Sequence, residues 1–332
     1  MTDGIYILAN DVVYNQLVAL LNSIEINAGN QFPVCVIPYD DRLEQVRQEV
    51  KARKNVEILE DVVSIARWED FSTEVWKAHP NAFNIWRERG NTGVYRLGMH
   101  RRFCGFDGPF ERFIYLDADI LVMNSLEPIF QRLNDYDFVV YDFQYKDPTH
   151  VYNVNSPKLL EVFDQEDIDS QIFCAGLYAS KIGVFNEERR NYLLEKLRAG
   201  EAEILYMNAP DQTILNYMVM KLGISSYNFS RHLSVSEVTG CCVTSPHFEE
   251  RDNVLYDKGN RLTYLHYIGL SSKLFNNLCA GENIDFPYRD LFLHYRYLHE
   301  PEKRPKLIGK PKPYNPPPSL ATKVLRKLGL TR

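Results

Sequence analysis

The sequence predicts an α/β domain with a mixed, mostly parallel sheet flanked by helices. Over the first sixty residues, short apolar strands alternate with helical stretches, which is the order that produces a parallel sheet wound by helices. The 332 residues, 45% hydrophobic and 25% charged, are enough for one large domain. The chain has no run of 18 apolar residues, so we expect no membrane-spanning helix.

Four strands and three helices are predicted in the first third of the chain. The strands are 5–9, 32–40, 56–59 and 113–116, and the helices are 14–27, 42–54 and 91–106. In the first helix, Leu17, Leu20, Leu21 and Ile24 recur at helical spacing. Residues 60–90 are rich in aromatic side chains. We expect that segment to be irregular, with residues 68–86 serving either as a flap over a bound ligand or as a set of buried anchors.

The remaining elements complete a body over residues 1–300, followed by a tail. The predicted strands are 137–143, 172–180 and 261–269, and the helices are 187–199, 211–222 and 285–299. Residues 301–332 form a basic, proline-rich tail, which we expect to be extended. A short amphipathic helix is predicted at its end, because Ala321, Val324, Leu325 and Leu328 share one face.

The distribution of charged residues changes at the same boundary, between residues 300 and 301. Residues 301–332 hold nine basic side chains and one acidic one, about +8, whereas the whole chain carries −6. The body is therefore acidic, which argues against nucleic acid as a partner. The tail suits reversible contact with an anionic membrane. Six cysteines without a C-x-x-C pair, and a first segment unlike a signal peptide, predict a cytoplasmic protein, held peripherally at the inner face of the membrane.

Two aspartates end the apolar strand in "FIYLDADIL", residues 113–121. Asp117 and Asp119 are two residues apart and point the same way in an extended segment. Their charges repel unless solvent or a cation separates them, and their oxygens suit Mg²⁺ or Mn²⁺. The same spacing recurs at Asp135/Asp137, where we expect a strand to begin, and at Asp167/Asp169, where we expect an exposed turn. At both places we expect solvated charges.

Six segments resemble the GT-A glycosyltransferases, most closely the retaining family-8 group that includes glycogenin and bacterial lipopolysaccharide galactosyl- and glucosyltransferases. Within residues 5–273 they are "ILANDVVYNQLVALLNSI", "NTGVYRLGM", "YLDADIL", "IFCAGLYAS", "APDQTILNYM" and "LHYIGLSSK". The resemblance implies a Rossmann-like GT-A fold with one catalytic domain at 1–300. Residues 1–125 would bind the nucleotide, and residues 126–300 the sugar and the acceptor.

The resemblance also assigns roles to residues. Mn²⁺, or Mg²⁺, would be held by Asp117, Asp119 and His266. The nucleotide would be bound by Ala9, Asp11, Arg96, Asp117, Ala118, Gly269 and Lys273, and the sugar by Cys174, Ala175 and Gly176. Gln212 would face the reactive carbon, and Asp211 would bind sugar hydroxyls. Two positions depart from the family pattern, since Cys174 replaces an asparagine and Lys273 comes one residue late after His266.

The implied reaction is metal-dependent transfer of a hexose from a nucleotide diphosphate sugar to a glycan or lipid-linked acceptor, with retention of configuration. UDP-glucose or UDP-galactose is the implied donor, with N-acetylated relatives left open. Three alternatives stay open: an inverting transferase or nucleotidyltransferase of this fold, a non-catalytic nucleotide-sugar binder, and a phosphatase with an aspartate nucleophile. Purely structural roles also stay open, as helix-terminal acids for Asp11 and Asp211 and as surface cations for Arg96 and Lys273.

Overall fold

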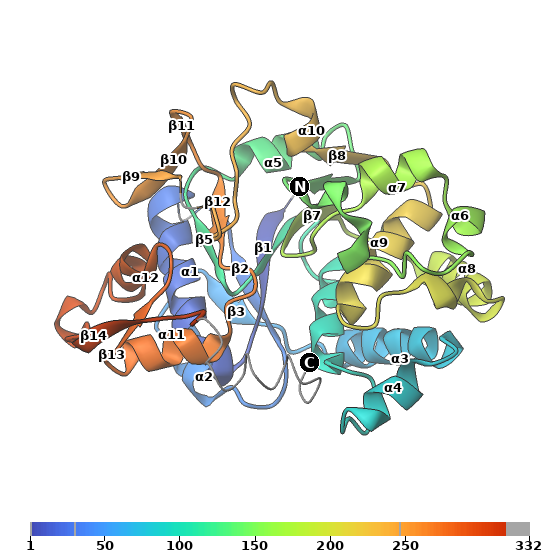
Figure 1. The fold of residues 1–332 in the computed structure, drawn as a ribbon, viewed down its shortest axis with the longest axis horizontal. Coiled ribbons are helices and arrows are strands. Elements are labelled where there is room, and N and C mark those ends of the chain that lie inside the picture. The colour runs from blue at the N-terminus through green and yellow to red at the C-terminus, as the bar shows by residue number, and fades with distance from the viewer. Residues whose placement is uncertain (1, 30, 246, 317–332) are drawn as a thin grey trace, which may run out of the picture.

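A seven-stranded sheet forms the centre of the computed structural model, which describes residues 2–29, 31–245 and 247–316 (Figure 1). The strand order is β3-β2-β1-β4-β7-β6-β8. The strands are β1 (Asp3–Ala9), β2 (Val34–Pro38), β3 (Val56–Ile58), β4 (Arg112–Asp117), β6 (Phe138–Val140), β7 (Leu177–Lys181) and β8 (Ser226–Asn228). Strand β7 runs antiparallel to both neighbours, and the other pairs are parallel. The predicted mixed, mostly parallel sheet is confirmed.

Helices cover both faces of this sheet because alternate strand residues point to opposite sides. Tyr6 and Leu8 of β1 pack into one buried cluster, whereas Ile5 and Ile7 pack into another. The first cluster lies under α3 (Val62–Ala78), α4 (Ala82–Glu88), the 3₁₀ segment η2 (Leu97–Phe106), α8 (Glu187–Arg198) and α9 (Pro210–Lys221). The second lies under α1 (Tyr14–Asn27), α2 (Glu44–Lys51) and α5 (Glu127–Arg132).

A third cluster joins the later part of the chain to the sheet. Strand β12 (Tyr264–His266) pairs antiparallel with β5 (Ile120–Val122), which directly follows β4. Around this pair lie β9 (Glu249–Arg251), β10 (Val254–Asp257), β11 (Asn260–Arg261), α11 (Ser272–Cys279), β13 (Glu282–Asp285), α12 (Arg289–Arg296) and β14 (Ile308–Pro313). The β5–β12 pair thus brings residues near 266 to the end of β4.

The first part of the basic tail belongs to the folded body. Strand β14 pairs in parallel with β13, next to α11 and α12 (Figure 1). The amphipathic helix expected near the end of the chain lies outside the described residues. Within the described ranges, no helix is long and apolar enough to cross a membrane.

The prediction for residues 60–90 was wrong, because α3 and α4 occupy most of the segment. Trp68, Phe71 and Val75 follow one another at helical spacing and are at most 5% exposed, so the aromatic side chains are buried anchors and not a flap. The predicted helix at 91–106 is a 3₁₀ segment that starts at Leu97. Asp167 lies in a short helix and not in a turn.

Shorter elements connect the others. They are α6 (Leu159–Val162), α7 (Gln165–Gln171), α10 (Phe229–His232) and the 3₁₀ turns η1 (Asp11–Val13), η3 (Gln144–Lys146), η4 (Pro148–His150), η5 (Glu201–Ile204) and η6 (Pro301–Lys303).

Candidate functional site

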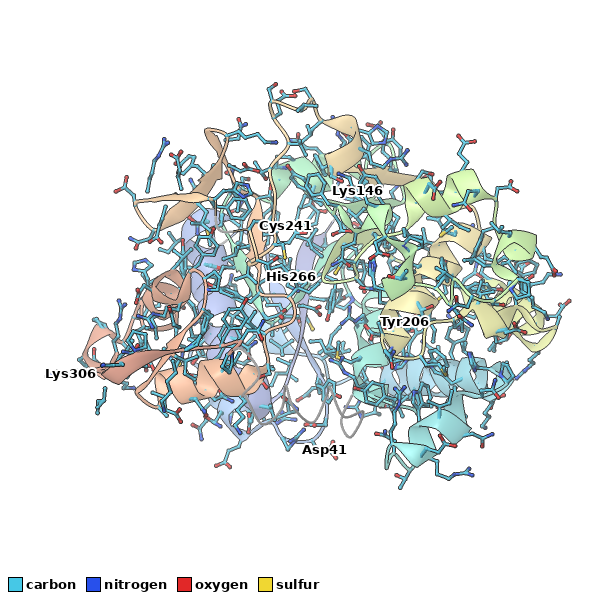
Figure 2. The ribbon with its side chains drawn as sticks, viewed as in Figure 1. Asp41, Lys146, Tyr206, Cys241, His266 and Lys306 are labelled. Atoms are coloured by element: carbon cyan, nitrogen blue, oxygen red, sulfur yellow. The ribbon has the colours of Figure 1, made fainter. Side chains whose placement is uncertain are left out.

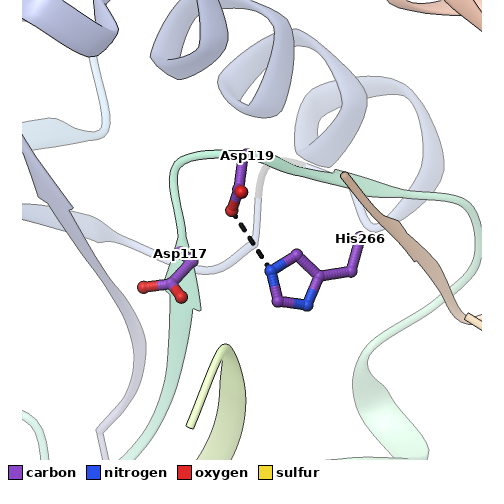
Figure 3. Close-up of side chains that lie close together, drawn as sticks. All are labelled: Asp117, Asp119 and His266. Atoms are coloured by element: carbon purple, nitrogen blue, oxygen red, sulfur yellow. Dashed lines mark ion pairs between the residues drawn. The ribbon is translucent and has the colours of Figure 1, made fainter. Parts of the chain in front are cut away.

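Asp117, Asp119 and His266 come together at the end of β4 (Figure 3). One ligand atom from each residue lies within 4.8 Å of the others, and the three form the one such group that the described residues contain. The Nε2 atom of His266 is 3.3 Å from Oδ1 of Asp119. Two carboxylates and one imidazole are a donor set that suits Mn²⁺ and also accepts Mg²⁺. The residues present therefore fit a divalent cation.

The strand register explains why His266 reaches this place from far along the chain. In the β5–β12 pair, His266 lies opposite Ile120, and the next amide, of Tyr267, donates to the Asp119 carbonyl at 2.9 Å. Gly176 packs against the imidazole, because a Cβ at that position would lie 2.3 Å from its Cε1 atom. Figure 2 shows His266 beside Cys241, whose carbonyl accepts from the His266 amide at 2.7 Å.

Electrostatics in the triad favour an ion pair between Asp119 and His266. Burial lowers the pKa of His266, but the Asp119 carboxylate and Cys174 together outweigh burial and raise that pKa well above its usual value. Burial likewise raises the pKa of Asp119, yet His266 holds it below its usual value. For Asp117, burial outweighs the nearby Arg102, so its pKa is raised.

Arg102 links the triad to the start of α9, and sequence reasoning missed it. Its guanidinium is 1% exposed and donates through Nη2 to Oδ1 of Asp117 at 2.9 Å. Its Nε lies 3.1 Å from Oδ2 of Asp211. Tyr115 adds an O–H donor to Asp117 at 2.8 Å and places its ring under the guanidinium. Arg102 therefore sets the orientation of two predicted site carboxylates at once.

Asp211 and Gln212 lie at the N-terminus of α9, as predicted. Burial raises the pKa of Asp211, but Arg102 reverses the effect and lowers it below its usual value. The Gln212 amide accepts from the Ala175 amide at 3.0 Å and donates to the His150 carbonyl at 3.1 Å. Both ends of this side chain are therefore held by the backbone.

Residues 173–176 connect the site residues to one another through backbone hydrogen bonds. The Cys174 amide donates to Asp142 at 3.0 Å. The Ala175 carbonyl accepts from Arg102 at 2.8 Å, and the Gly176 carbonyl accepts from the Asp117 amide at 2.8 Å. The predicted sugar-binding residues thus form a scaffold under the site.

A cavity of about 450 Å³ opens next to the triad. It lies between the ends of β1 and β4 and the N-terminus of α11. The predicted site residues that line the cavity are Ala9, Arg96, Asp117, Ala118 and Asp119. Its other lining residues include Asn10, Gln16, Tyr39, Arg42, Leu270, Ser271 and Ser272. Arg96 has a left-handed backbone, with φ of 53°, a conformation that costs energy for a side chain of this kind.

Three predicted nucleotide-binding residues, Asp11, Gly269 and Lys273, are not among the residues that line this cavity. Asp11 accepts a hydrogen bond from the Val46 amide at 3.0 Å, at the start of α2. Gly269 has φ of +83° in the turn before Leu270. Lys273 is exposed in the first turn of α11.

A second cavity, of about 280 Å³, is lined by His266, the triad residue that does not line the first cavity. Cys174 lines it and is buried against the imidazole. Asp142, also missed from the sequence, lines it and is 4% exposed. Asp142 lies two residues after the end of β6 and within the range 137–143 predicted as a strand, so a polar residue near that strand end was the available signal.

The fold is similar to those of solved glycosyltransferases. Mouse xyloside xylosyltransferase 1 superposes with a TM-score of 0.51 and 11% identity, over 71% of this chain and 87% of that one. The galactosyltransferase LgtC gives 0.50 and 16%, over 81% and 87%. The bifunctional glycosyltransferase WbbM gives 0.53 and 14%, over 92% of this chain but 52% of that chain, so this chain spans about half of WbbM.

No protein-family model and no curated protein sequence matches the chain. The structural likeness confirms the GT-A fold that the sequence motifs imply. At these low identities the likeness shows the fold and not the activity.

Proposed function

We propose that this chain is a metal-dependent glycosyltransferase. It moves a hexose from a nucleotide diphosphate sugar, UDP-glucose or UDP-galactose, to a glycan or lipid-linked acceptor with retention of configuration. The proposal depends above all on one observation, the convergence of Asp117, Asp119 and His266 at the edge of a 450 Å³ cavity that the two aspartates line. The GT-A fold supports it. Residues 1–125 would bind the nucleotide and residues 126–300 the sugar and acceptor.

The triad would hold the cation, and the imidazole favours Mn²⁺ over Mg²⁺. When bound, a divalent cation stabilises the charge of the departing diphosphate as a Lewis acid. The 450 Å³ cavity would take the nucleotide. Ser271 and Ser272 at the N-terminus of α11 line it, and the backbone amides of a helix N-terminus are suited to phosphate oxygens. Gly269 allows the turn before them, and Lys273 would add a cation at the same end.

Arg102, Asp211 and Gln212 would position the sugar. Asp211 stays ionised beside Arg102, so its free oxygen sites can accept hydrogen bonds from sugar hydroxyls. Gln212, held between Ala175 and His150, would face the reactive carbon. A phosphate oxygen of the leaving group would take the proton from the incoming hydroxyl on the same face of the sugar, which gives retention.

A panel of nucleotide sugars tests the proposal. Thermal unfolding is measured with UDP-glucose, UDP-galactose and their N-acetylated relatives, each with and without Mn²⁺, since a ligand that binds the folded state raises Tm. We expect one sugar to raise Tm in a Mn²⁺-dependent way and to be turned over when an acceptor is supplied. Binding without turnover indicates a non-catalytic binder, pyrophosphate release a nucleotidyltransferase, and a product anomer opposite to the donor an inverting enzyme.

We also propose that the basic tail brings the enzyme to an anionic membrane and its lipid-linked acceptor. Lys306, Lys310 and Lys312 lie in the exposed stretch around β14, and four further basic residues follow beyond residue 316. Since β14 belongs to the folded body, the sharper test keeps the chain intact. Reversing the charge of Lys323, Arg326 and Lys327 should weaken flotation with anionic liposomes, and undiminished flotation would exclude this part of the tail.

A further inference from the structure

Two cationic side chains share one aromatic ring in the 3₁₀ turn η3. The ammonium of Lys146 lies 5.7 Å from the centroid of the Tyr145 ring, and the guanidinium carbon of Arg231 also lies 5.7 Å from it. Lys146 lies over the ring of Phe143 as well, at 5.1 Å. The faces of such rings attract cations. Both cations are exposed, so a ligand in solution can reach them.

The positive charges of these two side chains are not compensated nearby. Among the described residues, neither Lys146 nor Arg231 forms an ion pair with a carboxylate. Arg231 donates through Nη1 to the Ser170 carbonyl, which orients the guanidinium without adding a negative charge. Two like charges beside one ring repel each other. An anion bound by both would remove that repulsion, and phosphate and carboxylate groups are the anions that such side chains bind.

The turn that carries Lys146 begins in the wall of the second cavity. Phe143 and Gln144 line this 280 Å³ cavity together with His266 of the triad, and η3 runs from Gln144 to Lys146. Neither Lys146 nor Arg231 is among the residues that line the 450 Å³ cavity, where the nucleotide is proposed to bind. The two cations are therefore placed for a group of the other substrate, the acceptor.

We infer that Lys146 and Arg231 bind an anionic group of the acceptor, a phosphate or a carboxylate next to the sugar that receives the hexose. This inference rests on the proposed function, because it requires the nucleotide in the 450 Å³ cavity and the acceptor at the second cavity. A phosphate would belong to a lipid-linked sugar, and a carboxylate to an acidic glycan. Charge-assisted hydrogen bonds are stronger than those between neutral groups, so this anion would help to select the acceptor.

Calorimetric titration of the full-length protein, saturated with UDP and Mn²⁺ so that the nucleotide site is filled, tests the inference. The probes are glucose 1-phosphate, methyl β-glucuronide and the neutral methyl β-glucoside. The wild type should bind one of the anionic probes roughly tenfold more tightly than the neutral one. Preference for glucose 1-phosphate would identify a phosphate as the recognised group, and preference for the glucuronide a carboxylate.

Two variants show whether the preference comes from these cations. In the double variant Lys146→Gln, Arg231→Gln, the three affinities should agree within about twofold. The matched control is Lys196→Gln, which removes an ammonium lying 5.3 Å over the Tyr192 ring in α8 and should keep the wild-type preference. Both substituted residues of the double variant are exposed, so its Tm should stay close to that of the wild type.

Several outcomes overturn the inference. A UDP-loaded wild type that prefers neither anionic probe to the neutral one does so without any variant. So does a double variant that keeps the wild-type preference. If the double variant keeps that preference but floats less with anionic liposomes, the two cations form a membrane contact instead. If the wild type does not bind UDP at all, the proposed function fails and the inference with it, which separates that result from the others.

Discussion

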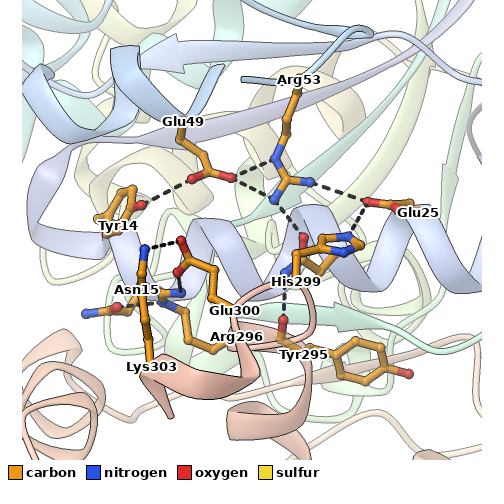
Figure 4. A network of polar contacts seen from close by, with 11 residues as sticks. Tyr14, Asn15, Glu25, Glu49, Arg53, Tyr295, Arg296, His299, Glu300 and Lys303 are labelled. Atoms are coloured by element: carbon orange, nitrogen blue, oxygen red, sulfur yellow. Dashed lines mark hydrogen bonds and ion pairs between the residues drawn. The ribbon is translucent and has the colours of Figure 1, made fainter. Parts of the chain in front are cut away.

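Two clusters of charged side chains border cavities at opposite ends of the central sheet. The triad lies at the C-terminal ends of β1 and β4, beside the 450 Å³ cavity. The other cluster lies at the start of β2 and β3, between α1, α2 and α12, beside a larger cavity of about 640 Å³ (Figure 4). Its charged members are Glu25, Glu49, Arg53, Arg296, His299, Glu300 and Lys303.

The clusters differ in how completely their charges are compensated. In the second one, Arg53 lies 2.7 Å from Glu49 and 3.7 Å from Glu25, and it also donates to Asn22. His299 contacts Glu25 at 3.0 Å. Around the triad, His266 pairs with Asp119 and Arg102 pairs with Asp117. Arg102 also pairs with Asp211, so three carboxylates share two cationic groups. The charge that neighbouring side chains leave uncompensated, and not the size of the cavity, indicates a candidate ligand site.

Removing a triad residue should have the largest effect of all, on sugar transfer. Asp119→Ala should lower sugar transfer by more than about a hundredfold, since even indirect supports of metal ligands cost 10–100-fold. Chelation of the wild type should give the same loss, and added Mn²⁺ should restore activity to the wild type only. Asp135→Ala removes an exposed aspartate of another D-x-D pair and is the control. Activity of Asp119→Ala within about threefold of the wild type would contradict the metal site.

Arg53→Met should affect stability and leave activity unchanged. Arg53 is 15% exposed, and its loss leaves Glu49 and Glu25 near each other without their shared cation. We expect the free energy of unfolding to fall by about 2 kcal/mol, less than for a fully buried pair because solvent screens the cluster. Urea unfolding measures the change, with the exposed neighbour Lys54→Met as control. A drop in transfer rate without a drop in stability would give this cavity a functional role.

His79 lies in neither cluster, and it should make the free energy of unfolding depend on pH independently of both. Burial lowers the pKa of His79 to about 4, and its Nδ1 accepts from the amides of Asn81 and Ala82. The neutral form is thus favoured in the folded state. Its contribution to stability is present above the unfolded pKa of about 6.5 and is lost as pH falls towards 4.

Between pH 7 and pH 5 this residue should cost about 2 kcal/mol of unfolding free energy. Urea unfolding at both pH values measures the loss, and His79→Asn should show a smaller pH dependence. An unchanged dependence in that variant would assign the effect to other groups.

The smallest effect is expected at the rim of the second cluster. The ion pair between His299 and Glu25 is 53% and 32% exposed, and exposed pairs contribute little. His299→Gln should change the free energy of unfolding by less than about 0.5 kcal/mol. A larger loss in urea unfolding would show that the pair stabilises the contact between α1 and the segment after α12.

The sequence predicted the sheet and the carboxylates well because both signals are local. A run of apolar residues that ends in Asp117 and Asp119 identifies the strand and its C-terminal end together. His266 was found through resemblance alone, since only the register of β5 and β12 brings it to the aspartates. Asp11, Gly269 and Lys273 remain predictions as ligands of the nucleotide.

Other features were not predicted from the sequence, because the residues that they contact are distant along the chain. Arg102 stands beside Arg101 in sequence, and nothing local says which of the two turns inward to Asp117 and Asp211. The helix α3 was missed although Trp68, Phe71 and Val75 show helical spacing, because aromatic content was given more weight than periodicity.

The effect of Gly176→Ala on activity would be easy to misinterpret. A single methyl group there would strike the ring of His266, with a Cβ–Cε1 separation of 2.3 Å, so the imidazole or the scaffold segment would have to move. Loss of activity in that variant would register as a chemical role, although the residue has no side chain with which to perform one. Its importance is the volume that it leaves empty.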